Sequence, residues 1–188
     1  MGRAKAALPF GATTILERIV TELRRRFDEI IVVAAPADAE PFPVDPIIRR
    51  VPGVILVRDE DSYAGPAAAL VRGLAAATHE VVFACSCDLP LISAELAHAL
   101  CGMIEGYDAV IPEVGARLQP LCAAYRRSSR SAIAAASVSE RRLTAIVSPL
   151  DLHIVREPEL RALDPDLRSF LNINTPESYT HALRLARL

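Results

Sequence analysis

The sequence lacks the features that would place it among membrane, secreted or nucleic-acid-binding proteins. Its 21 Lys and Arg against 23 Asp and Glu give a net charge of −2, so no basic surface for nucleic acid is expected. No apolar run is long enough to cross a membrane, and no apolar stretch of a secretory signal follows Arg3 and Lys5. We therefore expect a cytoplasmic protein without a membrane or nucleic-acid partner.

Several easily recognised site motifs are also missing. No G-x-G-x-x-G follows a strand, no Walker-type phosphate loop is present, and no G-x-S-x-G marks a nucleophilic serine. Cysteine is scarce, and its four residues have no further ligands at metal-binding spacing. This pattern favours reduced structural thiols over a metal site at Cys85, Cys87, Cys101 and Cys122.

What is present predicts one folded α/β domain. The 188 residues are 52% hydrophobic, which is enough to bury a core. Helical spacing predicts an amphipathic helix over residues 14–26, and Gly65-Pro66 opens a second helix through Ala77. Apolar, partly β-branched runs predict buried strands over residues 29–35 and 54–57. This alternation of strand and helix indicates a parallel sheet with right-handed crossovers.

The second half of the chain is less regular. Strands are expected over residues 108–112, 119–125 and 152–155, and Pro120 places the middle one in an antiparallel pair or at an edge. Helices are expected over residues 129–138 and 140–147 and again after Thr175-Pro176, which reads as a cap followed by a first-turn proline. The fold class is therefore a three-layer α/β/α domain with a mostly parallel, Rossmann-like sheet and an irregular second half.

The most informative stretch is residues 81–90. An apolar run typical of a strand buried on both faces ends at Asp88, and Pro90 prevents further ladder pairing. Ser93 then caps a helix expected over residues 93–105. Open α/β sheets bind ligands at the carboxyl ends of their strands, and a lone carboxylate in a phosphate site usually holds a divalent metal. The alternative is that Asp88 only caps a turn.

Six blocks of the sequence, taken in order, carry a resemblance to a known family. The blocks are residues 1–10, Asp59 with Gly65-Pro66, residues 83–90, residues 119–125, residues 140–143 and residues 170–177. Each block is modest alone, but the ordered set spans nearly the whole chain and resembles the molybdenum cofactor guanylyltransferases, the MobA family of the nucleotidyltransferase superfamily. The resemblance implies a fold like that of the nucleotide-diphospho-sugar transferases.

The resemblance implies transfer of GMP from GTP to the molybdenum-molybdopterin cofactor, with release of pyrophosphate and with Mg²⁺ as cofactor. It implies that Lys5 and Asp88 are catalytic and bind the nucleotide, that Asp88 is the metal ligand, and that Asp59 binds guanine or ribose. Without the resemblance, Lys5 reads as a solvated lysine and Asp59 as a loop cap. Molybdoenzymes or cofactor chaperones are the implied transient protein partners.

Acceptor binding is the role implied for Asn172, Asn174 and Arg141. The two Asn side chains would otherwise read as turn caps, and Arg141 with Arg142 as the surface of a helix start.

The chain departs from the family pattern at its beginning. Residues 1–10 match the end of the family's nucleotide loop, so within 1–188, expected to be a single nucleotidyltransferase domain, the first strand and the Gly-Gly turn are missing. Ala4 also stands where the family usually has aspartate. Two alternatives therefore stay open: a related nucleotidyltransferase that uses CTP or a sugar phosphate, and a non-catalytic nucleotide-binding relative.

Overall fold

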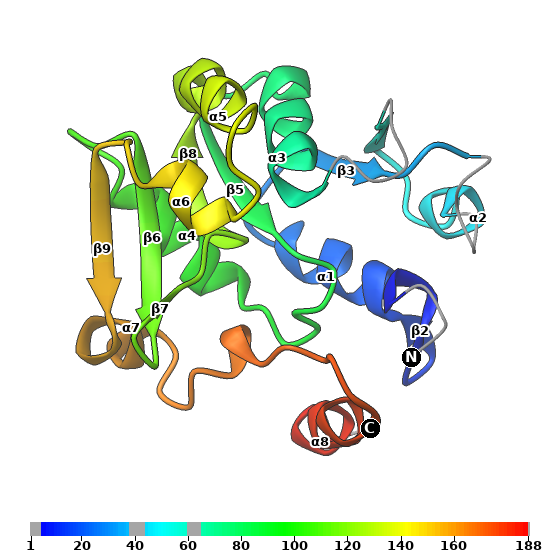
Figure 1. Cartoon of the computed structure of the whole chain (residues 1–188). Helices are drawn as coiled ribbons and strands as arrows, with labels where there is room; N and C mark the ends of the chain where they lie inside the picture. Colours follow the sequence, from blue (N-terminus) through cyan, green and yellow to red (C-terminus); the bar gives the residue numbers. More distant parts are fainter. Residues whose placement is uncertain (1–4, 38–43, 60–64, 188) are drawn as a thin grey trace.

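The protein is built in three layers, with strands between two groups of helices (Figure 1). The computed structural model describes residues 5–37, 44–59 and 65–187. Six longer strands make up the middle layer: β3 (Ile30–Ala34), β4 (Val54–Arg58), β5 (Val81–Cys85), β6 (Ala109–Val114), β8 (Cys122–Arg126) and β9 (Leu152–Arg156). Three strands are only two residues long: β1 (Pro9–Phe10), β2 (Thr13–Thr14) and β7 (Arg117–Leu118).

The strands form a mixed sheet region. β3 pairs with β4 in parallel, and β6 pairs with β9 in parallel. β8 lies between β5 and β6 and is antiparallel to both, so β5, β6 and β9 run in one direction and β8 runs in the other. The antiparallel pairing expected for residues 119–125 is thus confirmed, whereas an edge position is wrong. Pro120 precedes the first paired residue, Cys122, and so costs the ladder no donor.

Helices cover both faces of this layer (Figure 1). On one side lie α3 (Gly65–Ala76), α5 (Arg130–Ala136) and α6 (Leu143–Val147). On the other lie α1 (Ile15–Leu23), α4 (Ala94–Gly102) and α7 (Glu157–Leu163). The remaining helical segments are α2 (Asp45–Ile48), α8 (Pro176–Leu185) and the single 3-10 turns Lys5–Ala7, Arg127–Ser129 and Arg168–Phe170.

The period of two along β8 divides the core between these helical layers. Cys122 and Ala124 belong to the cluster beneath α1 and α4, while Ala123 and Tyr125 belong to the cluster beneath α3 and α5. All four are at most 1% exposed. Because both faces of this part of the strand are buried, these four side chains are apolar apart from the hydroxyl of Tyr125, which donates to the Pro120 carbonyl at 2.7 Å.

Several element boundaries differ from the expectation for identifiable reasons. The helix expected over residues 140–147 begins only at Leu143, because the Glu140 carboxylate accepts the backbone N–H groups of Arg141 and Arg142 at 2.7 and 2.8 Å. The first helix ends at Leu23 instead of residue 26, and the helix α7 was not foreseen. Part of the loop expected over residues 37–52, residues 38–43, lies outside the described residues.

The helix starts that depend on caps are confirmed. Thr14 and Glu17 form a reciprocal capping box at the start of α1, and Thr175 with Pro176 begins α8. Within the described residues, no helix combines the length and the apolar composition needed to cross the hydrocarbon core of a bilayer.

A substitution at Leu96 tests how tightly α4 is packed in the core. It lies on α4, is fully buried and belongs to the cluster that α1, α4 and α7 share. We expect Leu96→Ala to lower the free energy of unfolding by about 2–5 kcal/mol, because it removes buried methyl groups and leaves a cavity. Urea denaturation measures the loss, and the exposed Glu105→Ala serves as control. A loss below about 1 kcal/mol would show that α4 is not packed as described.

Candidate active site

The side chain of Asp88 stands at the carboxyl end of β5. The chain turns after Cys85: the N–H of Ser86 donates to Leu121 O at 2.9 Å, and the N–H of Leu89 donates to Ser86 O at 3.3 Å. Leu89 is only 3% exposed and anchors the turn in the core. The Asp88 side chain is 18% exposed, so its carboxylate borders solvent instead of being sealed in the interior.

Lys5, near the amino terminus, faces this carboxylate. Its Nζ lies 3.4 Å from Asp88 Oδ2 and also donates to Asn174 Oδ1. Lys5 is the only lysine in the sequence, whereas arginine occurs 20 times. A lysine presents a compact point charge, in contrast to the planar fork of arginine, and binds phosphate groups in that form.

Asn172 supports Asp88 from the segment after α7. In the amide orientation that satisfies its neighbours, its side-chain nitrogen donates to both carboxylate oxygens of Asp88, at 3.1 and 3.2 Å. The backbone joins the same segments, since the N–H of Ile173 donates to Asp88 O at 3.0 Å. Asn172 therefore holds the Asp88 carboxylate in one orientation. We call Lys5, Asp88, Asn172 and Asn174 the Asp88 cluster.

Contacts near the chain ends hold Lys5 in place. The hydroxyl of Tyr179 on α8 donates to Pro9 O, and its ring meets that of Phe10 edge to face at 6.5 Å between centroids. The N–H of Ile15 donates to Leu8 O at 3.0 Å, which ties the segment to the start of α1. Sequence reasoning missed the role of Tyr179, because nothing in the pattern around it indicates a partner 170 positions away.

Two of the expected site residues lie apart from this cluster. Asp59 follows β4 and pairs with Arg72 of α3, whose Nε lies 3.7 Å from Asp59 Oδ1. Arg141 is exposed in the turn before α6, where its N–H donates to Glu140. Among the described residues, no contact joins either one to the Asp88 cluster.

The environment of Asp59 disfavours its charged form. Burial raises the pKa of the Asp59 carboxyl above its ordinary value, and the nearby Arg72 partly offsets this effect. Its Oδ1 atom is buried and accepts no hydrogen bond within the described part of the chain. This oxygen lacks the hydrogen bond that usually offsets the cost of burying a carboxylate oxygen.

The residues at Asp88 fit a magnesium ion better than a thiolate metal. Mg²⁺ typically takes one or two protein carboxylates and completes its shell with phosphate and water oxygens. In residues 5–37, 44–59 and 65–187, no group of three or more His, Cys, Asp or Glu could hold a metal without a substrate. Burial raises the pKa of the Cys85 and Cys122 thiols, which keeps them protonated and removes them as ligands.

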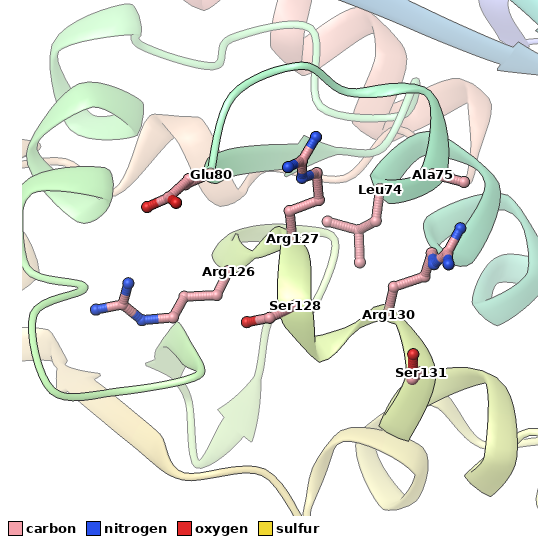
Figure 2. Close-up of a pocket in the computed structure, with 8 residues that line it drawn as sticks. All are labelled: Leu74, Ala75, Glu80, Arg126, Arg127, Ser128, Arg130 and Ser131. Carbon is pink, nitrogen blue, oxygen red and sulfur yellow. The ribbon is translucent and has the colours of Figure 1, made fainter.

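A cavity at the opposite end of β5 offers no comparable site. It has a volume of about 500 Å³ and is lined by Leu74 and Ala75 of α3, by Glu80 just before β5, and by residues from the end of β8 to the start of α5. Figure 2 shows that the guanidinium groups of Arg126, Arg127 and Arg130 point away from one another. Arg126 and Arg127 donate to backbone carbonyls of neighbouring loops, so they brace the fold.

The described strands and helices form a mixed α/β domain with charged and amide side chains at the carboxyl end of β5, where open α/β sheets bind ligands. The sequence matches the MobA-like NTP transferase domain over residues 1–156. The chain belongs to this family.

Relatives from other organisms agree with this assignment. A molybdenum cofactor guanylyltransferase of Desulfosudis oleivorans is 30% identical over 184 residues, covering 96% of this chain and 86% of the relative. A protein of Methanosarcina acetivorans named "probable molybdenum cofactor guanylyltransferase" is 32% identical over 179 residues, covering 92% of this chain and 79% of the relative.

Solved structures show the same fold at lower sequence identity. Molybdopterin-guanine dinucleotide biosynthesis protein A from Archaeoglobus fulgidus superposes with a TM-score of 0.82 at 21% identity, over 99% of this chain and 92% of its own. The 2-C-methyl-D-erythritol 4-phosphate cytidylyltransferase from Thermus thermophilus gives 0.71 at 20% identity, over 98% and 94%. The α/β fold expected from the sequence, of the nucleotide-diphospho-sugar transferase type, is thereby confirmed.

Proposed function

We propose that this protein transfers GMP from GTP to the molybdenum-molybdopterin cofactor and so forms the guanine dinucleotide and pyrophosphate. The observation that carries the proposal is the Asp88 cluster, in which one lysine, one carboxylate and two amides converge from three distant segments. The names of the relatives supply the donor and the acceptor.

The reaction needs positioning and charge neutralisation more than covalent help from the protein. An oxygen of the acceptor's terminal phosphate attacks the α-phosphorus of GTP, the bond from that phosphorus to the bridging oxygen breaks, and pyrophosphate leaves with its electron pair. Mg²⁺ held by Asp88 would neutralise the negative charge on the phosphate oxygens. We place the reacting phosphates beside Asp88, at the carboxyl end of β5.

Each member of the cluster has a distinct task in this proposal. Lys5 moves its ammonium group from Asp88 to the triphosphate oxygens when GTP binds, since these carry more negative charge than one carboxylate. Asn172 keeps the Asp88 carboxylate oriented throughout, through its two hydrogen bonds. Asn174, released from Lys5, is then free to bind the acceptor.

Asp59 and Arg141 complete the proposed assignments from outside the cluster. The buried Asp59 oxygen without a hydrogen bond suits a guanine N–H or a ribose hydroxyl as donor. The proposed contact of Arg141 with an anionic acceptor rests on the sequence resemblance, because its described hydrogen bond is to Glu140.

The setting of the reaction follows from its substrates. We propose that one nucleotidyltransferase domain carries it out in the cytoplasm, where GTP is available, and hands the product to molybdoenzymes or their chaperones by transient contact. The family match over residues 1–156 supports the nucleotidyltransferase domain.

Turnover with GTP and CTP tests the proposal, since a cytidylyltransferase shares the fold. We expect Mg²⁺-dependent pyrophosphate release with GTP and the molybdopterin acceptor, at least about tenfold faster than with CTP, because a mismatched base leaves hydrogen-bonding groups unpaired. Preference for CTP would overturn the assignment of the nucleotide. Absence of release, both from the 188-residue chain and from the same chain with a Gly-Gly loop added at its amino terminus, would favour a non-catalytic relative.

A further inference from the structure

The guanidinium group of Arg18 joins two segments that carry residues of the Asp88 cluster. Arg18 lies on α1, and its Nε donates to Pro90 O at 2.8 Å, two residues after Asp88. The same guanidinium lies over the ring of Phe10, with its carbon 5.3 Å from the ring centroid. Phe10 follows Lys5 by five residues. One side chain therefore contacts both the segment of Asp88 and the segment of Lys5.

A third segment meets this contact at Phe10. The Phe10 side chain is 1% exposed, and its ring lies edge to face with that of Tyr179, at 6.5 Å between centroids. Tyr179 lies on α8, which begins two residues after Asn174. We call Arg18, Phe10 and Tyr179 the Arg18 stack. All three segments that supply the Asp88 cluster meet in this stack.

The two contacts of Arg18 use different parts of its guanidinium group. The N–H groups donate in the plane of the guanidinium, whereas its flat face can rest on an aromatic ring. Arginine can make both contacts at once, and lysine, which has no flat face, cannot. The acceptor at Pro90 is a main-chain carbonyl, so the hydrogen bond positions the backbone of the turn that carries Asp88. Arg18 is half-buried, which shields both contacts from water.

Arg18 projects from a firmly anchored part of α1. The residues on either side of it are buried, with Glu17 at 8% and Ile19 at 5% exposed. Glu17 also completes the capping box with Thr14 at the start of the helix. A side chain on such a fixed turn can set the position of the segments that it contacts.

The ion pair inside the cluster is a weaker restraint than the Arg18 stack. Lys5 Nζ lies 3.4 Å from Asp88 Oδ2, and the two side chains are 31% and 18% exposed. Ion pairs that border water contribute little to stability, because water screens them, whereas a charged hydrogen bond between half-buried groups contributes more. The spacing of Lys5 and Asp88 therefore depends on the segments that carry them, and the Arg18 stack joins these segments.

We propose that Arg18 is a positioning residue, which holds the segments of Lys5 and Asp88 at a fixed spacing through its contacts with Pro90 and Phe10. This role rests on the proposed function, since both cluster residues would act on the phosphates of one nucleotide. A misplacement of about 1 Å in such a site lowers turnover about a hundredfold. Arg18 acts through its two contacts and does not itself meet the reacting atoms.

Turnover of Arg18→Met, compared with a matched arginine variant, tests this role. Arg126→Met is the control, because Arg126 is also half-buried and its Nε donates to Tyr107 O at 2.8 Å, but it lies opposite Val81 at the other end of β5. We expect each variant to lower the melting temperature by no more than about 10 °C. Only Arg18→Met should lower kcat for pyrophosphate release, about tenfold to a hundredfold, with the KM for GTP changed less than about threefold.

Two further measurements separate positioning from a merely structural role. Arg18→Lys keeps a donor for Pro90 O but loses the flat face, so it should restore only part of the lost kcat. In the protein without nucleotide, ¹³C-methyl groups on Lys5, the only lysine, report its contact with Asp88 by NMR. Asp88→Asn should shift their resonance in the unmodified protein and in Arg126→Met, but less than about half as far in Arg18→Met.

Any of four results would overturn the positioning role of Arg18. They are a kcat of Arg18→Met within about threefold of the unmodified protein, an equal fall in kcat for Arg18→Met and Arg126→Met, full recovery in Arg18→Lys, and an Asp88→Asn shift of the Lys5 resonance that is the same with and without Arg18. If the unmodified protein turns over no nucleotide, the proposed function fails, and the resonance alone then decides whether Arg18 fixes the spacing of the two segments.

Discussion

We expect Asp88→Asn to lower the rate of pyrophosphate release from GTP about a hundredfold to a thousandfold. The change removes the one carboxylate charge of the cluster while keeping the size of the side chain. Loss of a single preorganised group that stabilises transition-state charge has an effect of this size. Mg²⁺ would also bind more weakly, since an amide oxygen is a poorer ligand than a carboxylate.

Steady-state turnover with GTP and a Mn²⁺ titration followed by electron spin resonance measure the two effects separately. Asp151→Asn changes an exposed aspartate just before β9; it is the matched control and should keep both values. We expect the melting temperature of Asp88→Asn to stay within a few degrees, because its ion pair with Lys5 is partly exposed and contributes little stability. Turnover within threefold of the unmodified protein would exclude Asp88 from the reaction.

We expect Lys5→Met to weaken GTP binding about tenfold to a hundredfold. Methionine keeps most of the length of the side chain and removes the ammonium group, so the loss corresponds to a charged hydrogen bond to phosphate, about 1.5–3 kcal/mol. Lys5→Arg should restore part of the affinity, because the charge returns in a different geometry. Calorimetry with GTP and Mg²⁺ gives the dissociation constants.

Because Lys5 is the only lysine in the sequence, its contact with Asp88 can be followed in solution by NMR. Reductive methylation with ¹³C-formaldehyde labels Lys5 and the chain's amino terminus only, so the Lys5 methyl resonance can be followed directly. We expect this resonance to shift on addition of GTP with Mg²⁺, as the ammonium group leaves Asp88 for the triphosphate. Unchanged affinity in Lys5→Met together with an unshifted resonance would remove Lys5 from the nucleotide site.

A double variant of Asp88 and Lys5 tests whether the two side chains act together. Asp88 and Lys5 are in contact, so the effects of the two substitutions should not add, and the double variant should be less impaired than the sum of the single losses predicts. Additive losses would mean that the two side chains act at separate places.

Local sequence patterns determined most of the secondary structure and one functional position. Buried strands carry apolar runs, caps carry Thr or Ser, and these signals lie within a few residues of one another, so β5, α1 and α8 were predictable. The same local pattern placed Asp88 at a strand end. It failed at Glu140, where a carboxylate bound to two backbone N–H groups delays the helix start.

The sequence by itself therefore determined the α/β class, the order of the elements and the position of Asp88 at the end of a strand. Only the tertiary structure decided which distant residues meet. Lys5 contacts Asp88, 83 positions away, and Asn174, 169 positions away, whereas Arg141 stays apart from them. Such contacts depend on how whole layers pack, and no pattern within a few neighbouring residues encodes them.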